Sequence, residues 1–167
     1  MKLYIALITL ITITTTSLSR AQTLDSSFYN WTVYEIESSK IGNKKCYMVS
    51  HPVEQKTNDY SREKPYIIIT RYQNERKEEV GIFSGYEYKI SSDIFVVIDD
   101  LKFTFHTNKD MAWTKTRDQD SFVIQKMLYG KYLMVRSNSS IGTYGIDKYS
   151  LKGIAKAYNR VKEICGS

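Results

Sequence analysis

Short runs rich in β-branched and aromatic residues fill the middle of the chain and predict β-strands. Residues 66–72 follow Pro65 directly, and residues 94–98 form an uninterrupted apolar run. The second run is typical of a strand that is covered on both faces. We predict further strands at residues 28–36, 46–51, 80–83, 86–90, 102–106 and 132–136. Strands this short and this closely spaced favour an antiparallel β-sandwich or a barrel-like sheet.

Apolar residues recur at helical spacing in two further segments. Val123 and Met127 are one turn apart in a helix predicted over residues 121–129, which Asp120 would cap and Gly130 would end. The C-terminal segment begins with a Ser150 cap, and its apolar face comprises Leu151, Ile154, Ala155, Tyr158, Val161 and Cys165. The predicted fold class is therefore mainly β, with one short helix and an amphipathic C-terminal helix.

The N-terminus has the pattern of a secretory signal peptide. Lys2 precedes an uncharged, threonine-rich apolar stretch over residues 3–18, and Ser19 and Ala21 supply the small residues of a cleavage site after Ala21. The alternative is a retained membrane anchor, but a span needs about 20 predominantly apolar residues. We predict a signal peptide at residues 1–21 and a single domain at residues 22–167, located in the periplasm or at the cell surface, with no stable membrane span after cleavage.

Export changes the interpretation of the two cysteines, Cys46 and Cys165. An even pair of cysteines in an exported chain predicts a disulfide. The bond would close a loop over most of the domain and connect a strand to the end of the last helix. Two free thiols or an intermolecular bond are the alternatives.

Charge adds a candidate binding surface. The whole chain carries a formal net charge of +6, part of which lies in the predicted signal peptide. The polar face of the C-terminal helix carries Lys152, Lys156, Arg160 and Lys162. This stripe is either a solvated helix face or a surface for an anionic envelope or host-surface component. The 14 tyrosines either fill sheet faces or form a binding face. Neither feature predicts nucleic acid as a partner.

No motif assigns catalytic residues, a metal site or a cofactor. His51 and His106 are far apart in the sequence, and the chain has no CxxC, no GxSxG and no phosphate-binding glycine loop. His106 shares a strand face with Lys102 and Thr104, which predicts that it faces solvent. Asp99 and Asp100 follow an apolar run and predict a hairpin turn.

Several short motifs recur in an order that resembles a known family. The most specific is the segment 147–153, which follows Gly142-Thr143 and precedes Ala157 and Cys165. The other matching segments are Trp31-Thr32-Val33, Cys46-Tyr47, Ser50-His51-Pro52, residues 62–66, Ile69-Thr70-Arg71, Glu79-Val80, Gly85-Tyr86, Ile98-Asp99, Ala112-Trp113 and Met134-Val135. Together these motifs resemble the invasion-associated locus B family of bacterial exported proteins. Ile154 and Ile141 depart from the pattern, since an aromatic and a basic residue are more usual at those positions.

The resemblance implies an envelope or secreted protein linked to host-cell invasion, in a family that offers no catalytic residues to transfer. We therefore expect a non-enzymatic protein that binds an envelope or host-cell component. One alternative is a periplasmic hydrolase acting on envelope material, which would place His51 or His106 beside a serine or cysteine nucleophile. Another is a structural or chaperone-like periplasmic protein.

Overall fold

The computed structural model describes residues 22–36, 44–73, 75 and 77–166. The predicted signal peptide at residues 1–21 lies outside the described residues. The strands are β1 (Gln22–Phe28), β2 (Trp31–Ile36), β3 (Lys45–Ser50), β4 (Glu54–Thr57), β5 (Tyr66–Tyr72), β6 (Lys77–Phe83), β7 (Asp93–Ile98), β8 (Leu101–Asn108), β9 (Met111–Trp113), β10 (Tyr132–Asn138) and β11 (Tyr144–Ser150). The helices are α1 (Arg117–Tyr129) and α2 (Ile154–Ile164).

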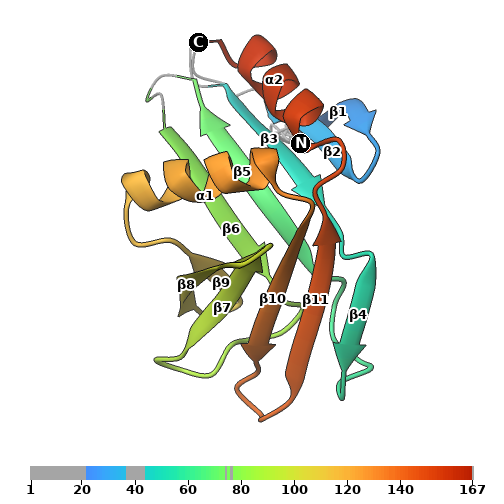
Figure 1. The fold of residues 1–167 in the computed structure, drawn as a ribbon, viewed down its shortest axis with the longest axis vertical. Coiled ribbons are helices and arrows are strands. Elements are labelled where there is room, and N and C mark those ends of the chain that lie inside the picture. The colour runs from blue at the N-terminus through green and yellow to red at the C-terminus, as the bar shows by residue number, and fades with distance from the viewer. Residues whose placement is uncertain (1–21, 37–43, 74, 76, 167) are drawn as a thin grey trace, which may run out of the picture.

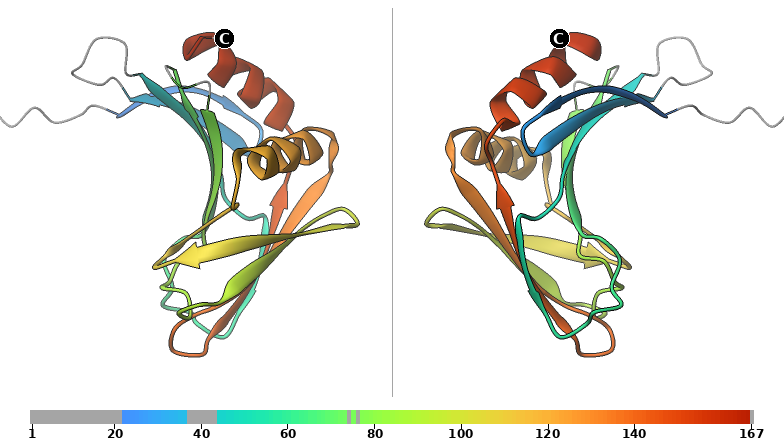
Figure 2. Two further views of the ribbon diagram at one scale, coloured as in Figure 1. Left: turned by 90° about the vertical axis from the view of Figure 1, so that its left-hand side faces the viewer. Right: turned by 90° about the vertical axis from the view of Figure 1, so that its right-hand side faces the viewer.

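The strands of the described residues belong to one antiparallel sheet. Their order is β1-β2-β3-β5-β6-β9-β8-β7-β10-β11-β4, so β1 and β4 are its two ends and the sheet is open. The sheet bends strongly, and both helices lie on the same side of β3 and β5 (Figures 1 and 2). The mainly β, antiparallel fold class with a short helix and an amphipathic C-terminal helix is confirmed.

The core lies between the inward face of the bent sheet and the two helices. Strand alternation produces this face, because Trp31 and Val33 on β2 are buried while Thr32 and Tyr34 point outward. Helix residues such as Met127 complete the same apolar cluster. Burying each such side chain contributes about 1.5–3 kcal/mol. The outward face of the sheet is left without a helix in the described part of the chain.

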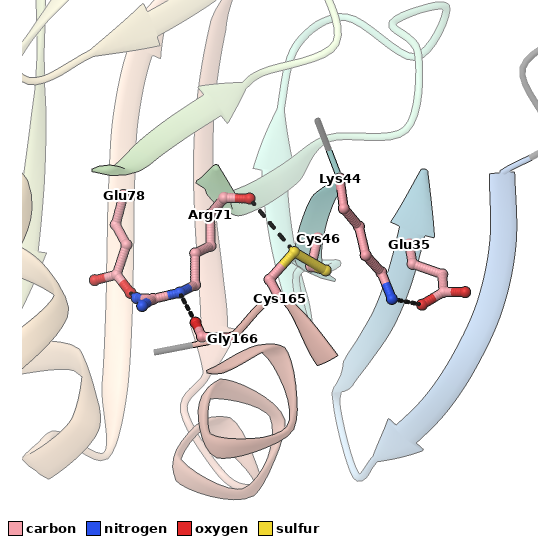
Figure 3. Close-up of a disulfide and its surroundings, with 7 residues drawn as sticks. All are labelled: Glu35, Lys44, Cys46, Arg71, Glu78, Cys165 and Gly166. Carbon is pink, nitrogen blue, oxygen red and sulfur yellow. Dashed lines mark hydrogen bonds and ion pairs between the residues drawn. A yellow bond between two sulfur atoms is a disulfide. The ribbon is translucent and has the colours of Figure 1, made fainter. Parts of the chain in front are cut away.

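The predicted disulfide between Cys46 and Cys165 is confirmed. The two Cα atoms are 5.9 Å apart, and the residues are separated by 119 positions in sequence. The bond connects β3 to the C-terminal end of α2 (Figure 3). Arg71 reinforces the same junction, since its Nε donates to the Gly166 carbonyl at 3.1 Å and its guanidinium pairs with Glu78 at 2.5 Å (Figure 3).

Three strand predictions were wrong in part. The strand predicted over residues 28–36 begins at Trp31, because Tyr29 has a φ of 55° in the turn from β1 to β2. The apolar run 94–98 is covered on one face only, since Phe95 is 41% exposed. Residues 86–90 form only an isolated bridge, Tyr88 to Ser139. Their backbone groups form hydrogen bonds with two separate segments, near Lys109 and near Asn138, and not with the whole length of one neighbouring strand.

The two predicted N-terminal helix caps were also wrong. Thr116 caps α1 through its side chain, and Asp120 lies inside the first turn, where its Oδ1 accepts from the Val80 N–H at 2.9 Å. Gly130 ends α1 as predicted. Gly153 is the N-cap of α2, because Ser150 still belongs to β11 and its Oγ accepts from the Lys152 N–H. On α2 the buried position is Ala157 and not Ala155.

The hairpin turn predicted at Asp99 and Asp100 is confirmed between β7 and β8. His106 is half-exposed beside Asp93, its side chain 31% accessible, and Lys102 and Thr104 on the same strand face are exposed. This agrees with the prediction that His106 faces solvent.

Candidate functional site

A groove with four tyrosines among its lining residues crosses the outward face of β2, β3 and β5. It has a volume of about 560 Å³. Its lining residues are Gln22, Tyr34, Ile36, Lys45, Tyr47, Val49, His51, Tyr66, Ile68, Thr70 and Tyr72. We call this surface the tyrosine groove. Helix α2 packs on the opposite face of β2 and β3, and α1 lies on the same side of the sheet against β6 (Figure 2).

The register of the paired strands brings the tyrosines of the groove together on one face of the sheet. Tyr34 on β2 is opposite Tyr47 on β3, and Tyr47 is opposite Thr70 on β5. Directly opposite residues in an antiparallel pair point to the same face of the sheet. The rings of Tyr34 and Tyr47 stack with centroids 5.2 Å apart and an interplanar angle of 16°. The groove floor is thus a fixed aromatic surface.

Three tyrosines of the groove, Tyr47, Tyr66 and Tyr72, have raised pKa values, so their hydroxyls stay protonated over the physiological pH range. Burial raises the pKa of Tyr47 to about 12. Burial, together with a hydrogen bond to Glu79, raises the pKa of Tyr72 to about 12. Burial also raises the pKa of Tyr66. A protonated hydroxyl is a hydrogen-bond donor, and those of Tyr72 and Tyr66 already donate to Glu79 and to Met111 Sδ.

Polar side chains mark the two ends of the groove. At one end Lys45 lies 4.7 Å from the centre of the Tyr72 ring, and the Tyr72 hydroxyl donates to Glu79 at 2.9 Å. At the other end His51 Nδ1 is 2.8 Å from the Pro65 carbonyl oxygen, and the His51 ring meets the Tyr66 ring edge to face. An apolar floor with a few polar groups is typical of a ligand site.

Sequence reasoning included tyrosines as a possible binding face but did not identify which ones lie together. The pairing of β2 with β3 and of β3 with β5 decides which tyrosines lie together. The prediction of residues 28–36 as a single strand did not provide that pairing. The sequence offers one signal for the groove, the alternation of side chains along a strand. On the strand after Pro65 it places Tyr66 and Tyr72 on the same face as Ile68 and Thr70.

The histidines do not assemble a nucleophilic site in the described residues. His106 Nδ1 is 2.6 Å from Asp93 Oδ1 at the rim of a second cavity of about 500 Å³. The hydrogen bonds found for the imidazole rings of His51 and His106 reach no serine or cysteine side chain in the described part of the chain. The described residues also contain no cluster of three or more histidine, cysteine or acidic side chains able to hold a metal ion.

The cations of the predicted basic stripe contact different neighbours and do not all face solvent freely. Arg160 donates to both oxygens of Asp25 on β1, at 2.8 and 2.7 Å, and also contacts Glu163. Lys152 precedes α2 and lies 4.3 Å from the Tyr29 ring centre, while Lys162 lies 5.6 Å from that of Tyr158. Lys156 is exposed. Arg160 therefore serves the contact between β1 and α2.

Neither described helix has the length and apolar character that crossing a membrane requires.

The comparison with protein-family models gives one informative match. The model described as "Invasion associated locus B (IalB) protein" matches residues 31–162. This range begins at Trp31 on β2 and includes the tyrosine groove except for Gln22. No curated protein and no solved structure matches the chain.

Proposed function

Because the chain belongs to the invasion associated locus B family, we propose that it is an exported, non-enzymatic envelope protein whose tyrosine groove binds an envelope or host-cell component. In this proposal the protein acts in the periplasm or at the cell surface, and the bound component links it to host-cell invasion. Its role is recognition, with no bond made or broken.

The observation that carries the proposal is the half-exposed tyrosine cluster on an uncovered sheet face. Tyr34, Tyr66 and Tyr72 are only partly buried, although large aromatic side chains gain free energy from full burial. Tyrosines supply contact area with little loss of side-chain entropy, and they are frequent among the residues that dominate binding energy.

Two features support export. The Cys46–Cys165 bond is of the kind that persists in oxidising compartments. The N-terminal pattern at residues 1–21 is that of a signal peptide. A direct check is the N-terminal sequence of the protein recovered from the periplasm and culture medium, where we expect a start at Gln22.

The binding proposal is tested by affinity capture. Immobilised residues 22–167, with the disulfide formed, are exposed to fractions of the bacterial envelope and of host-cell surfaces. The groove variant combines Tyr34→Ala with Tyr72→Ala. We expect it to retain its partner at least about tenfold less well, since central interface tyrosines each contribute on the order of 2 kcal/mol.

The matched control combines Tyr60→Ala with Tyr129→Ala, which removes the same chemical groups from positions that are 95% and 85% exposed outside the groove. Circular dichroism and thermal unfolding establish that both variants are folded. Equal capture by the two variants would show that the groove is not the binding site. If the unsubstituted chain captures nothing above a blank matrix, the binding function itself is refuted.

A further inference from the structure

The other half of the sheet presents a second, different outward surface, on β8, β7, β10, β11 and β4. Register gives two rows of side chains that point the same way. One row is Thr104, Phe95, Arg136, Ile146 and Lys56, and the next is Lys102, Val97, Met134, Lys148 and Glu54. We call these rows, with the flanking Tyr132 and Tyr144, the basic sheet face. Figure 1 shows β7, β10, β11 and β4 side by side below the helices.

Cations dominate this face. Its acidic member, Glu54, is paired with Lys148 at 2.8 Å, and the adjoining Asp93 is paired with His106. Lys56, Lys102 and Arg136 have no ion pair with any described acidic residue. All three are exposed. The face therefore carries an uncompensated positive charge that complements an anionic partner.

Apolar side chains lie between these cations. Phe95, Tyr132 and Tyr144 are 41%, 48% and 44% exposed. The ammonium of Lys102 lies 3.7 Å from the Phe95 ring centre, and that of Lys148 lies 4.5 Å from the Tyr132 ring centre. Val97, Met134 and Ile146 are half-buried and fill the surface between the rings. Lys102 and Lys148 thus each lie beside a half-exposed aromatic ring.

We propose that the basic sheet face docks the protein on an anionic phospholipid surface. Lysine and arginine would contact the lipid phosphates, while Phe95 and the two tyrosine rings would enter the interface between headgroups and acyl chains. This arrangement uses the preference of aromatic rings for the membrane interface and of long cationic side chains for headgroups. It leaves the tyrosine groove free.

The geometry favours a lipid surface over a soluble polyanion. A lipid surface extends in two dimensions, and the face spans five strands, whose four spacings of about 4.8 Å give a width of roughly 20 Å. The Phe95 side chain has no polar atom with which to recognise a polymer in water, yet it is exposed within its row, between Thr104 and Arg136. An apolar ring flanked by cations gains most where charge and hydrocarbon lie next to each other.

The test is flotation of residues 22–167 with vesicles of phosphatidylcholine alone or mixed with phosphatidylglycerol. We expect binding only to the anionic vesicles, and weaker binding as salt screens the exposed charges. The variant that combines Lys56→Gln with Arg136→Gln should bind on the order of 10–30-fold more weakly, since each cation near an anionic membrane contributes about fivefold. Phe95→Ser should also weaken binding.

The matched control is Lys156→Gln with Lys162→Gln on α2, which changes the net charge of the protein equally. Unaltered vesicle binding by this control supports the proposal, and an equal loss would overturn it in favour of a net-charge effect or of binding through the predicted basic stripe on α2. Retention on immobilised heparin without binding to anionic vesicles would overturn it in favour of a polyanion. Full binding by Phe95→Ser would overturn ring insertion. Each substituted position is exposed, and circular dichroism is used to check that the variants fold.

Discussion

Arg160 shows how one cation on a helix face can be committed to a single partner. Its guanidinium makes two hydrogen bonds to the Asp25 carboxylate, across a separation of 135 residues in sequence. These hydrogen bonds lower the pKa of Asp25 from 3.8 to about 2. The pair attaches edge strand β1 to α2, so Arg160 contributes to structure more than to an open binding surface.

The lowered pKa of Asp25 predicts a contribution to stability that depends on pH. The unfolded chain takes up a proton at Asp25 near pH 3.8, whereas the folded chain resists protonation until about pH 2. The contribution is therefore fully present above pH 3.8 and is lost as the pH falls through 2. In urea unfolding, the difference in unfolding free energy between the parent and Asp25→Asn should be constant above about pH 4 and shrink below it.

Arg160→Gln removes the cause of the shift and should reproduce this pH profile. If the difference between the parent and Asp25→Asn is the same at every pH between 5 and 2, the ion pair does not stabilise the fold.

Single residues were predictable from sequence where few alternatives existed. With only two cysteines, Cys46 and Cys165 had one intramolecular pairing. The role of Asp120 was not predictable in the same way, because the sequence does not distinguish an aspartate that caps a helix from one that is buried in its first turn. Its true partner, the Val80 N–H, comes from a strand 40 residues earlier.

At the scale of elements, the beginning of α2 depends on a close approach between two backbone segments. Gly153 has a φ of 96°, and a Cβ built there would lie 2.1 Å from the Phe28 carbonyl oxygen. The residue must therefore lack a side chain for two reasons, the left-handed conformation and the contact with β1. Its position fixes how α2 leaves β11 and crosses the N-terminal strands.

Gly153→Ala should destabilise the protein by more than about 3 kcal/mol, because backbone strain adds to a steric clash that only a shift of β1 or α2 can relieve. The control is Gly142→Ala, since Gly142 also has a positive φ of 87° but a Cβ at that position would meet no atom within 4 Å. We expect the control to cost only about 1–2 kcal/mol. Chemical denaturation measures both, and equal losses would mean that the Phe28 contact is unimportant.

Elements were predictable where the periodic pattern was intact. The strands around residues 66–72 and 132–136 follow apolar alternation closely. β11 interrupts the pattern because its buried positions include Gly145 and Asp147, and the latter is buried through its pairing with Arg62. β4 has no apolar residue at all, and its backbone pairing with β11 alone makes it a strand.

At the scale of the whole molecule, the two surfaces follow from strand order and register, which the sequence did not reveal. Consecutive strands pair in places, as β2 with β3, but β4 pairs with β11 and β10 pairs with β7. Such contacts depend on packing between distant segments and not on local pattern. The fold class could therefore be predicted, whereas the tyrosine groove and the basic sheet face could not.

Arg62 is the residue that ties these distant segments together. It lies between β4 and β5, and its guanidinium donates to both oxygens of Asp147 on β11, at 2.9 and 2.6 Å. It also donates to the Gln55 side chain on β4 and to the Ser84 carbonyl after β6. The Arg62 and Asp147 side chains are only 4% and 1% exposed. This contact joins the β4 end of the sheet to the β5–β6 region, so both outward surfaces depend on it.

Arg62→Leu or Asp147→Leu alone should lower the unfolding free energy by about 3–5 kcal/mol, because each leaves one charge buried without its partner. The double variant removes both charges and should cost clearly less than the sum of the single losses. Urea unfolding of the four proteins measures this coupling. The exposed pair Lys148 and Glu54 is the control, and its Gln variants should show far weaker coupling. Additive losses at Arg62 and Asp147 would show that the two side chains stabilise the sheet independently, through their other neighbours, and that the buried pair does not hold its ends together.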